Sequence, residues 1–246
     1  MPFKYLHVIP ITQGLIFSIT SAFAFIMAVF VNKDVPPVFP YISDVGVWSL
    51  ERCIFTIGMD FGALFCMATL YIRYRQVIEI LDSKRNELCY KRLKILNRIS
   101  LYLSVLSQIG VVILAAFPDY PYFVPHLIGA SSAFGCGIIF IAIQTYISFK
   151  LYPHFGKAFL NNIRLLLLVI TFIALIVTSV AGTIAFSEFK GGDYTQWTKE
   201  SGGYDYHLIS VGGEWVLAPG LLLYIALYSI EFKHIILHNP SIEAKV

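Results

Sequence analysis

The chain has 246 residues, of which 57% are apolar, 15% aromatic and only 13% charged. Water-soluble domains of this length carry more charge, so the composition excludes a soluble enzyme or adaptor and predicts an integral membrane protein. The net charge of +3 is too small to indicate nucleic acid as a partner.

Six apolar runs are each long enough to cross a bilayer, which takes about 20 helical residues. The sequence therefore predicts an all-α membrane protein, a bundle of six transmembrane helices in a single domain of residues 1–246. An even number of spans places both termini on one side, and that side collects most of the Lys and Arg residues. Because cytoplasmic loops are rich in these cations, both termini are predicted to be cytoplasmic. The predicted spans are residues 9–31, 53–72, 95–117, 125–149, 164–187 and 207–230.

The first outer connection, residues 32–52, differs from a flexible linker. Pro36, Pro37 and Pro40 fix φ and restrict the residues before them, while Tyr41 and Trp48 are among several aromatic and apolar side chains available for burial. We expect this proline-rich loop to fold down as a cap on the outer end of the bundle.

Two acids, Asp60 and Glu214, fall inside predicted spans. An acidic side chain in hydrocarbon costs about 2.5–3.5 kcal/mol on insertion scales, so both are expected to face protein or water. The candidate neighbours of Asp60 are Gln108, Gln144 or backbone groups freed near glycines. Arg73 closes the second span and is expected to snorkel to the inner interface, as cations at helix ends do.

Packing of the fourth span is predicted from small residues that recur at helical spacing. They form one face, which predicts a close contact with a neighbouring helix. These residues are Gly129, Ser132, Ala133, Cys136 and Gly137.

Histidines and acids gather on the predicted outer side of the membrane. In a helix, His207 and Glu214 share one face and lie about 10 Å apart along the axis. His126 heads the fourth span on the same side, and the loop adds Asp44 and Glu51. For Glu51 the alternative role is charge stabilisation at the N-terminus of the second span.

Three kinds of site fit this outer set. One is a hydrogen-bonded latch in which Asp44 and Glu214 accept from the histidines and from loop amides. Another binds a polar lipid headgroup or a divalent metal, since histidine with carboxylate suits zinc. The third is catalytic, with a histidine–acid pair as general base, and Ser43 or Ser210 available as nucleophile. No Gly-x-Ser-x-Gly elbow accompanies the serines.

Three stretches carry a family resemblance. They are Phe39 to Gly46 followed by Glu51 and residues 53–55, the Tyr71–Val77 end of the second span, and Tyr206-His207 with Glu214-Trp215. Together they resemble the damage-regulated autophagy modulator (DRAM) family, within a wider group that includes proteins of GPI-anchor lipid remodelling. The matching positions are Pro40, Tyr41, Ile42, Ser43, Asp44, Gly46, Glu51, His126, His207, Glu214 and Trp215. Leu50 and Asp60 depart from the pattern, which usually has a proline and an amide there.

The resemblance implies a six-span protein of lysosomes or other endomembranes, or of the plasma membrane, linked to autophagy and to lipid handling. Membrane lipids and a protein partner in trafficking or autophagy are the partners it implies. Tyr41, Ser43, Asp44, Glu51 and Trp215 are the expected lipid- or ligand-binding residues. No cofactor is predicted, although a divalent metal at the histidine–carboxylate cluster stays open.

Two rival functions remain at this stage. A lipid hydrolase or acyltransferase embedded in the membrane would use His126, His207, Glu214 and Asp44 as its catalytic set. A transporter would use Asp60 and Glu214 as proton carriers, and broken helices and inverted repeats should accompany it.

Overall fold

The computed structural model describes residues 4–83 and 90–236, and in these ranges every regular element is helical. Six of the helices are long and apolar enough to cross a membrane. The predicted fold class, an all-α bundle of six spans, is therefore confirmed. The long helices are α1 Val8–Phe25, which continues into the π-helical turn Ile26–Val31, α2 Ser49–Ser83, α3 Tyr90–Ala116, α4 Phe123–Leu151, α5 Ala158–Glu188 and α6 Tyr204–Ala226, followed by the short α7 Tyr228–Phe232.

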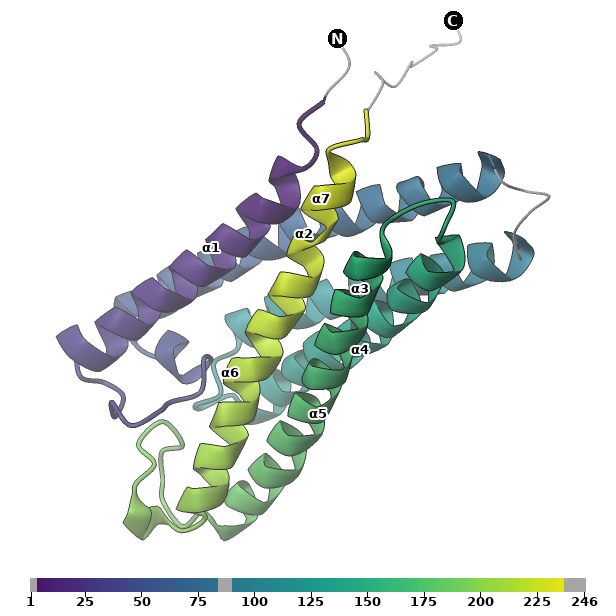
Figure 1. Ribbon diagram of the computed structural model, residues 1–246. Coiled ribbons are helices and arrows are strands. Elements are labelled where there is room, and N and C mark those ends of the chain that lie inside the picture. Colours follow the sequence, from purple (N-terminus) through teal and green to yellow (C-terminus); the bar gives the residue numbers. More distant parts are fainter. Residues whose placement is uncertain (1–3, 84–89, 237–246) are drawn as a thin grey trace, which may run out of the picture.

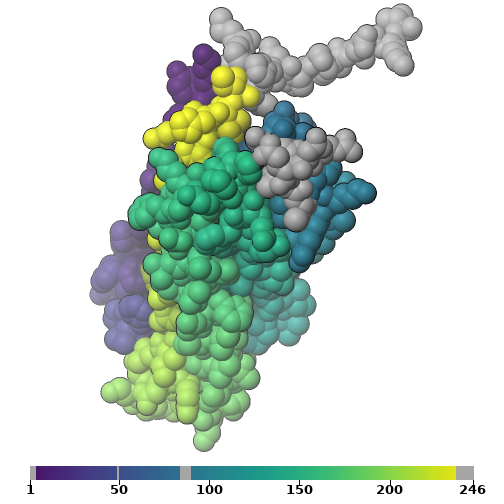
Figure 2. Space-filling model, turned by 45° about the vertical axis from the view of Figure 1, so that its right-hand side comes forward, coloured from purple at the N-terminus to yellow at the C-terminus, as the bar shows by residue number. Residues whose placement is uncertain are grey.

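The bundle has two distinct ends (Figure 1). Three connections, residues 32–48, 117–122 and 189–203, lie together at what we call the loop end. At the opposite end, the terminal end, the start of α1 lies beside α7, and Leu6 and Phe232 share one buried core. Figure 2 shows α1 along one flank and residues 189–203 covering the loop end.

Neighbouring helices along the chain pack against one another, with α3 on α4 and α5 on α6 as extensive pairs. The small-residue face predicted for the fourth span makes the first of these contacts. A β-carbon added at Gly129 would lie 2.6 Å from the amide nitrogen of Leu114, and one at Gly110 would lie 2.4 Å from that of Ala133. Only glycine lets the two backbones approach this closely, so the predicted packing face is confirmed.

Helices α2 and α3 extend past the predicted spans. α2 continues to Ser83, well beyond residue 72, because a helix that leaves the hydrocarbon can run on through polar residues. Many large apolar side chains on the outside of the bundle are exposed, among them Phe159, Leu64 and Val124. In a membrane these side chains face lipid rather than water, so their exposure carries no penalty.

The prediction for Arg73 is wrong. Its side chain is fully buried rather than snorkelling, because a carboxylate and several amide and hydroxyl groups from four other positions converge on it. The expected neighbours of Asp60 also differ. Gln144 bonds Arg73, Asn97 and Ser100, and Gln108 bonds Ser107, so neither amide pairs with Asp60.

Candidate functional site

The proline-rich segment 32–48, here called the roof, folds onto the loop end of α6. The amide of Ile42 donates to Glu214 Oε2 at 3.0 Å, and the indole Nε1 of Trp215 donates to the carbonyl of Pro40 at 3.0 Å. These bonds join residues distant in sequence, and they satisfy backbone groups that an irregular loop would otherwise leave unpaired. The expected cap is therefore present, and Glu214 is one of the groups that hold it.

Tyr41 adds a third attachment. Its hydroxyl donates to Ser210 Oγ at 2.8 Å, and Ser210 in turn donates to the carbonyl of Thr178 on α5. Burial, together with the carboxyl groups of Glu214 and Asp44, raises the pKa of Tyr41 above its ordinary value of 10.0. The phenol therefore stays protonated and keeps its role as donor.

Asp44 is almost completely buried inside the roof, where its Oδ2 accepts the amide of Tyr41 at 2.8 Å. Burial raises the pKa of Asp44 well above its ordinary value of 3.8, and the neighbouring carboxyl groups of Asp119 and Glu214 raise it further. Asp119 comes from the connection between α3 and α4, so Asp44 of the roof has carboxyl neighbours from that connection and from α6.

His207 is held by aromatic rings. Its imidazole stacks on Trp197 with ring centroids 4.4 Å apart and meets the Tyr41 ring edge-on at 5.1 Å. Nδ1 is buried without a hydrogen-bond partner. His207 therefore packs between the roof and the 189–203 connection, and it does not form the pair with Glu214 that a general base would need.

The remaining predicted residues are separated. His126 Nδ1 lies 3.1 and 2.8 Å from the carbonyl oxygens of Leu114 and Phe117, so it ties α4 to the end of α3. Glu51 lies in the first turn of α2, where it accepts from Asn32, and a carboxylate is favoured there by the helix dipole. Within the described part of the chain, no hydrogen bond joins His126 or His207 to a carboxylate. The bonds formed match the latch more closely than the catalytic arrangement.

A cavity of about 770 Å³ lies beneath the roof. Its walls come from α1, α2, α3, α4 and α6, and its loop end is formed by Ile42, Ser43, Glu214, Trp215 and His126. The lining on α1 runs from Ile11 to Ile26, a rise of about 22 Å, whereas one leaflet of a bilayer is about 15 Å thick. Exposed lining residues on α1 and α6, such as Leu15 and Leu223, mark where the cavity reaches the side of the bundle.

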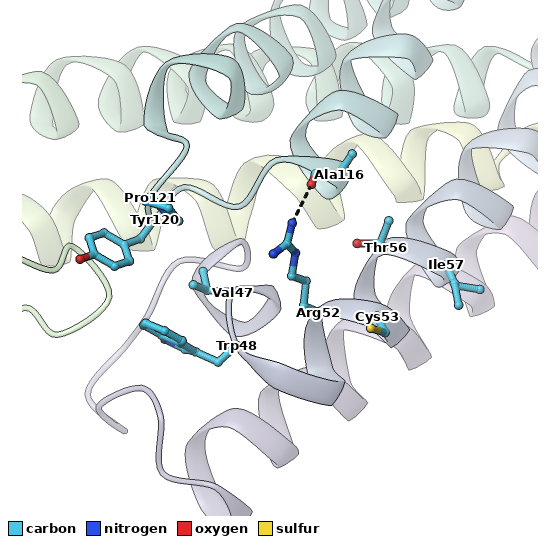
Figure 3. Close-up of a pocket in the computed structure, with 9 residues that line it drawn as sticks. All are labelled: Val47, Trp48, Arg52, Cys53, Thr56, Ile57, Ala116, Tyr120 and Pro121. Carbon is cyan, nitrogen blue, oxygen red and sulfur yellow. Dashed lines mark hydrogen bonds between the residues drawn. The ribbon is translucent and has the colours of Figure 1, made fainter.

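A second cavity of about 870 Å³ opens beside the first turns of α2 (Figure 3). Trp48, Tyr120 and Pro121 lie on one side of it, and Arg52 points across it toward the Ala116 carbonyl at 3.4 Å. It shares no lining residue with the cavity beneath the roof. The loop end therefore holds two separate spaces, one next to an acid and one next to a cation.

The terminal end holds a buried charged cluster that the sequence analysis missed. The carboxylate of Glu231 forms ion pairs with Arg73 Nη1 at 2.8 Å and with Arg164 Nη1 at 2.9 Å. Both guanidinium groups lie over the Tyr228 ring, 5.1 Å from its centroid. Gln76, Gln144 and Ser148 accept further bonds from Arg73. Arg164 begins the predicted fifth span and Glu231 directly follows the predicted sixth span, so opposite charges at a similar membrane depth were the available signal.

Among residues 4–83 and 90–236, no three His, Cys, Asp or Glu side chains form a group able to hold a metal ion. Asp44 and Glu214 accept hydrogen bonds from backbone amides of the roof.

Comparison with known proteins gives the family. A family model described as the Frag1/DRAM/Sfk1/Cwh43P N-terminal domain matches residues 5–235. The chain belongs to this family. The DRAM resemblance carried by the roof and by α6 is thereby confirmed. No solved structure matches the chain.

Several relatives in this family are named for autophagy. DNA damage-regulated autophagy modulator protein 2 of Bos taurus is 31% identical over 216 residues, which cover 87% of this chain and 79% of the relative. Protein 1 of the same name in Xenopus laevis is 34% identical over 212 residues, covering 86% and 84%. The Xenopus laevis modulator of macroautophagy TMEM150B-B is 25% identical over 197 residues, covering 80% and 72%.

Proposed function

We propose that this protein modulates autophagy by holding a membrane lipid in the cavity beneath the roof. It acts from a lysosomal or related endomembrane, with the roof on the luminal side and both termini in the cytosol. Its role is to bind rather than to catalyse.

The observation that carries the proposal is the cavity itself. Its volume of about 770 Å³ lies in the range of about 300–1,000 Å³ typical of ligand pockets, and its lining is largely apolar. It runs along α1 for more than the thickness of one leaflet and reaches the side of the bundle, where lipid tails would surround it in a membrane. An acyl chain or another lipid tail fits these properties, whereas a polar metabolite does not.

The printed names of the relatives support the process. Relatives of both DRAM types, and the TMEM150B-B relative, are named as modulators of autophagy. The orientation is supported by charge, because most cations of the chain fall on the terminal side of the predicted spans. The lysosomal location is supported by the family resemblance. It also suits the roof, because the raised pKa of Asp44 favours the folded roof at acidic pH.

Filling the cavity tests the proposal. A β-carbon added at Gly14, which lines the cavity from α1, meets nothing within 4 Å, so Gly14→Phe places a ring in the cavity without a backbone clash. Gly135 on α4 also has no atom within 4 Å of an added β-carbon but does not line the cavity, so Gly135→Phe is the matched control.

Both variants are expressed in cells that lack the protein. Autophagic flux is measured as degradation of a long-lived cargo, and lysosomal fractionation checks location. We expect Gly14→Phe to lose the rescue that wild type and Gly135→Phe provide. Equal rescue by both variants, at equal protein levels, would show that the cavity has no part in the function.

A further inference from the structure

The polar groups that line the cavity bear on which lipid headgroup it can hold. Among residues 4–83 and 90–236, no Lys or Arg lines the cavity, and Glu214 is the acid in its wall. A phosphate placed there would meet a carboxyl group and no counter-charge. Because unpaired charge in a space of low polarity is strongly disfavoured, the cavity wall disfavours an anionic phosphate that brings no cation of its own.

In the part of the chain that the structure describes, three atoms of the cavity wall that can accept a hydrogen bond have no donor. His126 Nδ1 faces two carbonyl oxygens and donates to them, so in the neutral form of the ring Nε2 can accept a hydrogen bond. Glu214 uses Oε2 for the Ile42 amide, and no hydrogen bond to Oε1 occurs among the described residues. Gln108 Oε1 is buried without a partner.

Gln13 adds a fourth polar side chain deeper in the cavity. It is completely buried, and neither its Oε1 nor its Nε2 has a partner. Buried amides of this kind are normally satisfied, so a group that reaches them gains hydrogen bonds at no competing cost. These unsatisfied groups line the same cavity, which a lipid would reach from the side of the bundle.

We infer that the cavity takes a phosphate-free lipid whose head carries hydroxyl groups, such as a diacylglycerol, a ceramide or a sterol. The hydroxyl donates to the acceptors near Glu214 and His126, and the tail extends toward the terminal end. This inference rests on the proposed function, because it specifies which lipid the cavity holds.

The neighbouring cavity provides the contrast. Arg52 lines that space, so a phospholipid that binds this protein is expected there rather than beneath the roof. The experiment must therefore separate the two sites, and Arg52→Gln removes the cation from the second site while leaving the first untouched.

The purified full-length protein is titrated in detergent with diacylglycerol, ceramide or cholesterol, and in parallel with phosphatidic acid. Thermal stability and native mass spectrometry report binding, all in the Arg52→Gln background. We expect the hydroxyl-headed lipids to raise the melting temperature and to bind at least ten-fold more tightly than phosphatidic acid. Gly14→Phe, in the same background, should abolish the effect.

Two variants then test the headgroup contacts. Gln108→Leu removes one acceptor and should weaken binding about five-fold, the value of one hydrogen bond. Glu214→Gln keeps an acceptor for Ile42 but replaces the carboxyl group by a neutral amide, so it should narrow the discrimination against phosphatidic acid. Asp60→Asn, which removes an acid that does not line the cavity, should leave the discrimination unchanged.

The outcomes distinguish the two proposals. If phosphatidic acid binds as tightly as the hydroxyl-headed lipids and Gly14→Phe blocks it, the headgroup inference is overturned while the lipid-binding function stands. If no lipid binds in a way that Gly14→Phe prevents, both are overturned.

Discussion

Substitution of Glu231 by Gln should destabilise this protein more than removal of any surface charge. Glu231 accepts from Arg73 at 2.8 Å and from Arg164 at 2.9 Å, and the two arginine side chains are 1% and 0% exposed. Removing one partner of a buried ion pair costs about 3–5 kcal/mol, because the remaining charge is left uncompensated. Here one substitution leaves two guanidinium groups without a carboxylate, so we expect at least about 3 kcal/mol.

The free energy of unfolding is measured by titration with a denaturing detergent. Lys94→Gln is the control, since Lys94 and Asp82 form a pair at 3.5 Å whose side chains are 33% and 47% exposed. Such surface pairs contribute up to about 1 kcal/mol. Arg164→Met, added to Glu231→Gln, should restore part of the loss, because it removes a guanidinium whose Nε and Nη2 have no partner.

A loss no larger than that of Lys94→Gln would refute the reasoning. It would mean that the two arginines are adequately solvated by their neutral neighbours and that Glu231 does not hold the terminal end together.

Three further predictions concern the packing and the roof. Gly129→Val should destabilise the fold by more than about 1–3 kcal/mol, because the new valine side chain meets the α3 backbone. Gly135→Val on the same helix should be tolerated. Thermal unfolding of the two variants in detergent compares their stability. The raised pKa of Asp44 means that the folded protein keeps a proton that the unfolded chain loses above pH 3.8, so stability should be greatest in acid and fall as pH rises toward neutrality. Asp44→Asn should flatten that dependence in melting curves recorded across pH. Tyr41→Phe removes the bond to Ser210 and should cost about 0.5–1.5 kcal/mol, which faster proteolysis of the roof would reveal.

The sequence predicted well those features that depend on the bilayer alone. Span number follows from the thickness of hydrocarbon, and the docking of the roof follows from prolines that stiffen a segment rich in apolar side chains. Small residues on one face of α4 also sufficed to predict its contact with α3, because their effect is steric and local.

Partners were harder to predict, because sequence gives the depth of a residue in the membrane but not its direction around the bundle axis. His126 and His207 have similar depths, yet one bonds the end of α3 and the other packs against Trp197. Arg73 has the pattern of an interfacial cation, and only the fold shows that Glu231 lies beside it. Long-range pairing of this kind depends on which helices are neighbours, and a local sequence pattern does not indicate which helices pack together.

The order of Arg73, Arg164 and Glu231 along the chain matters for biosynthesis. Arg73 and Arg164 leave the ribosome long before Glu231 does, so their charges stay uncompensated while the first five spans are inserted. The two arginines are consequently neutralised only when α7, which carries Glu231, has been synthesised. A chain that ends before Glu231 would leave the guanidinium groups of Arg73 and Arg164 without this carboxylate.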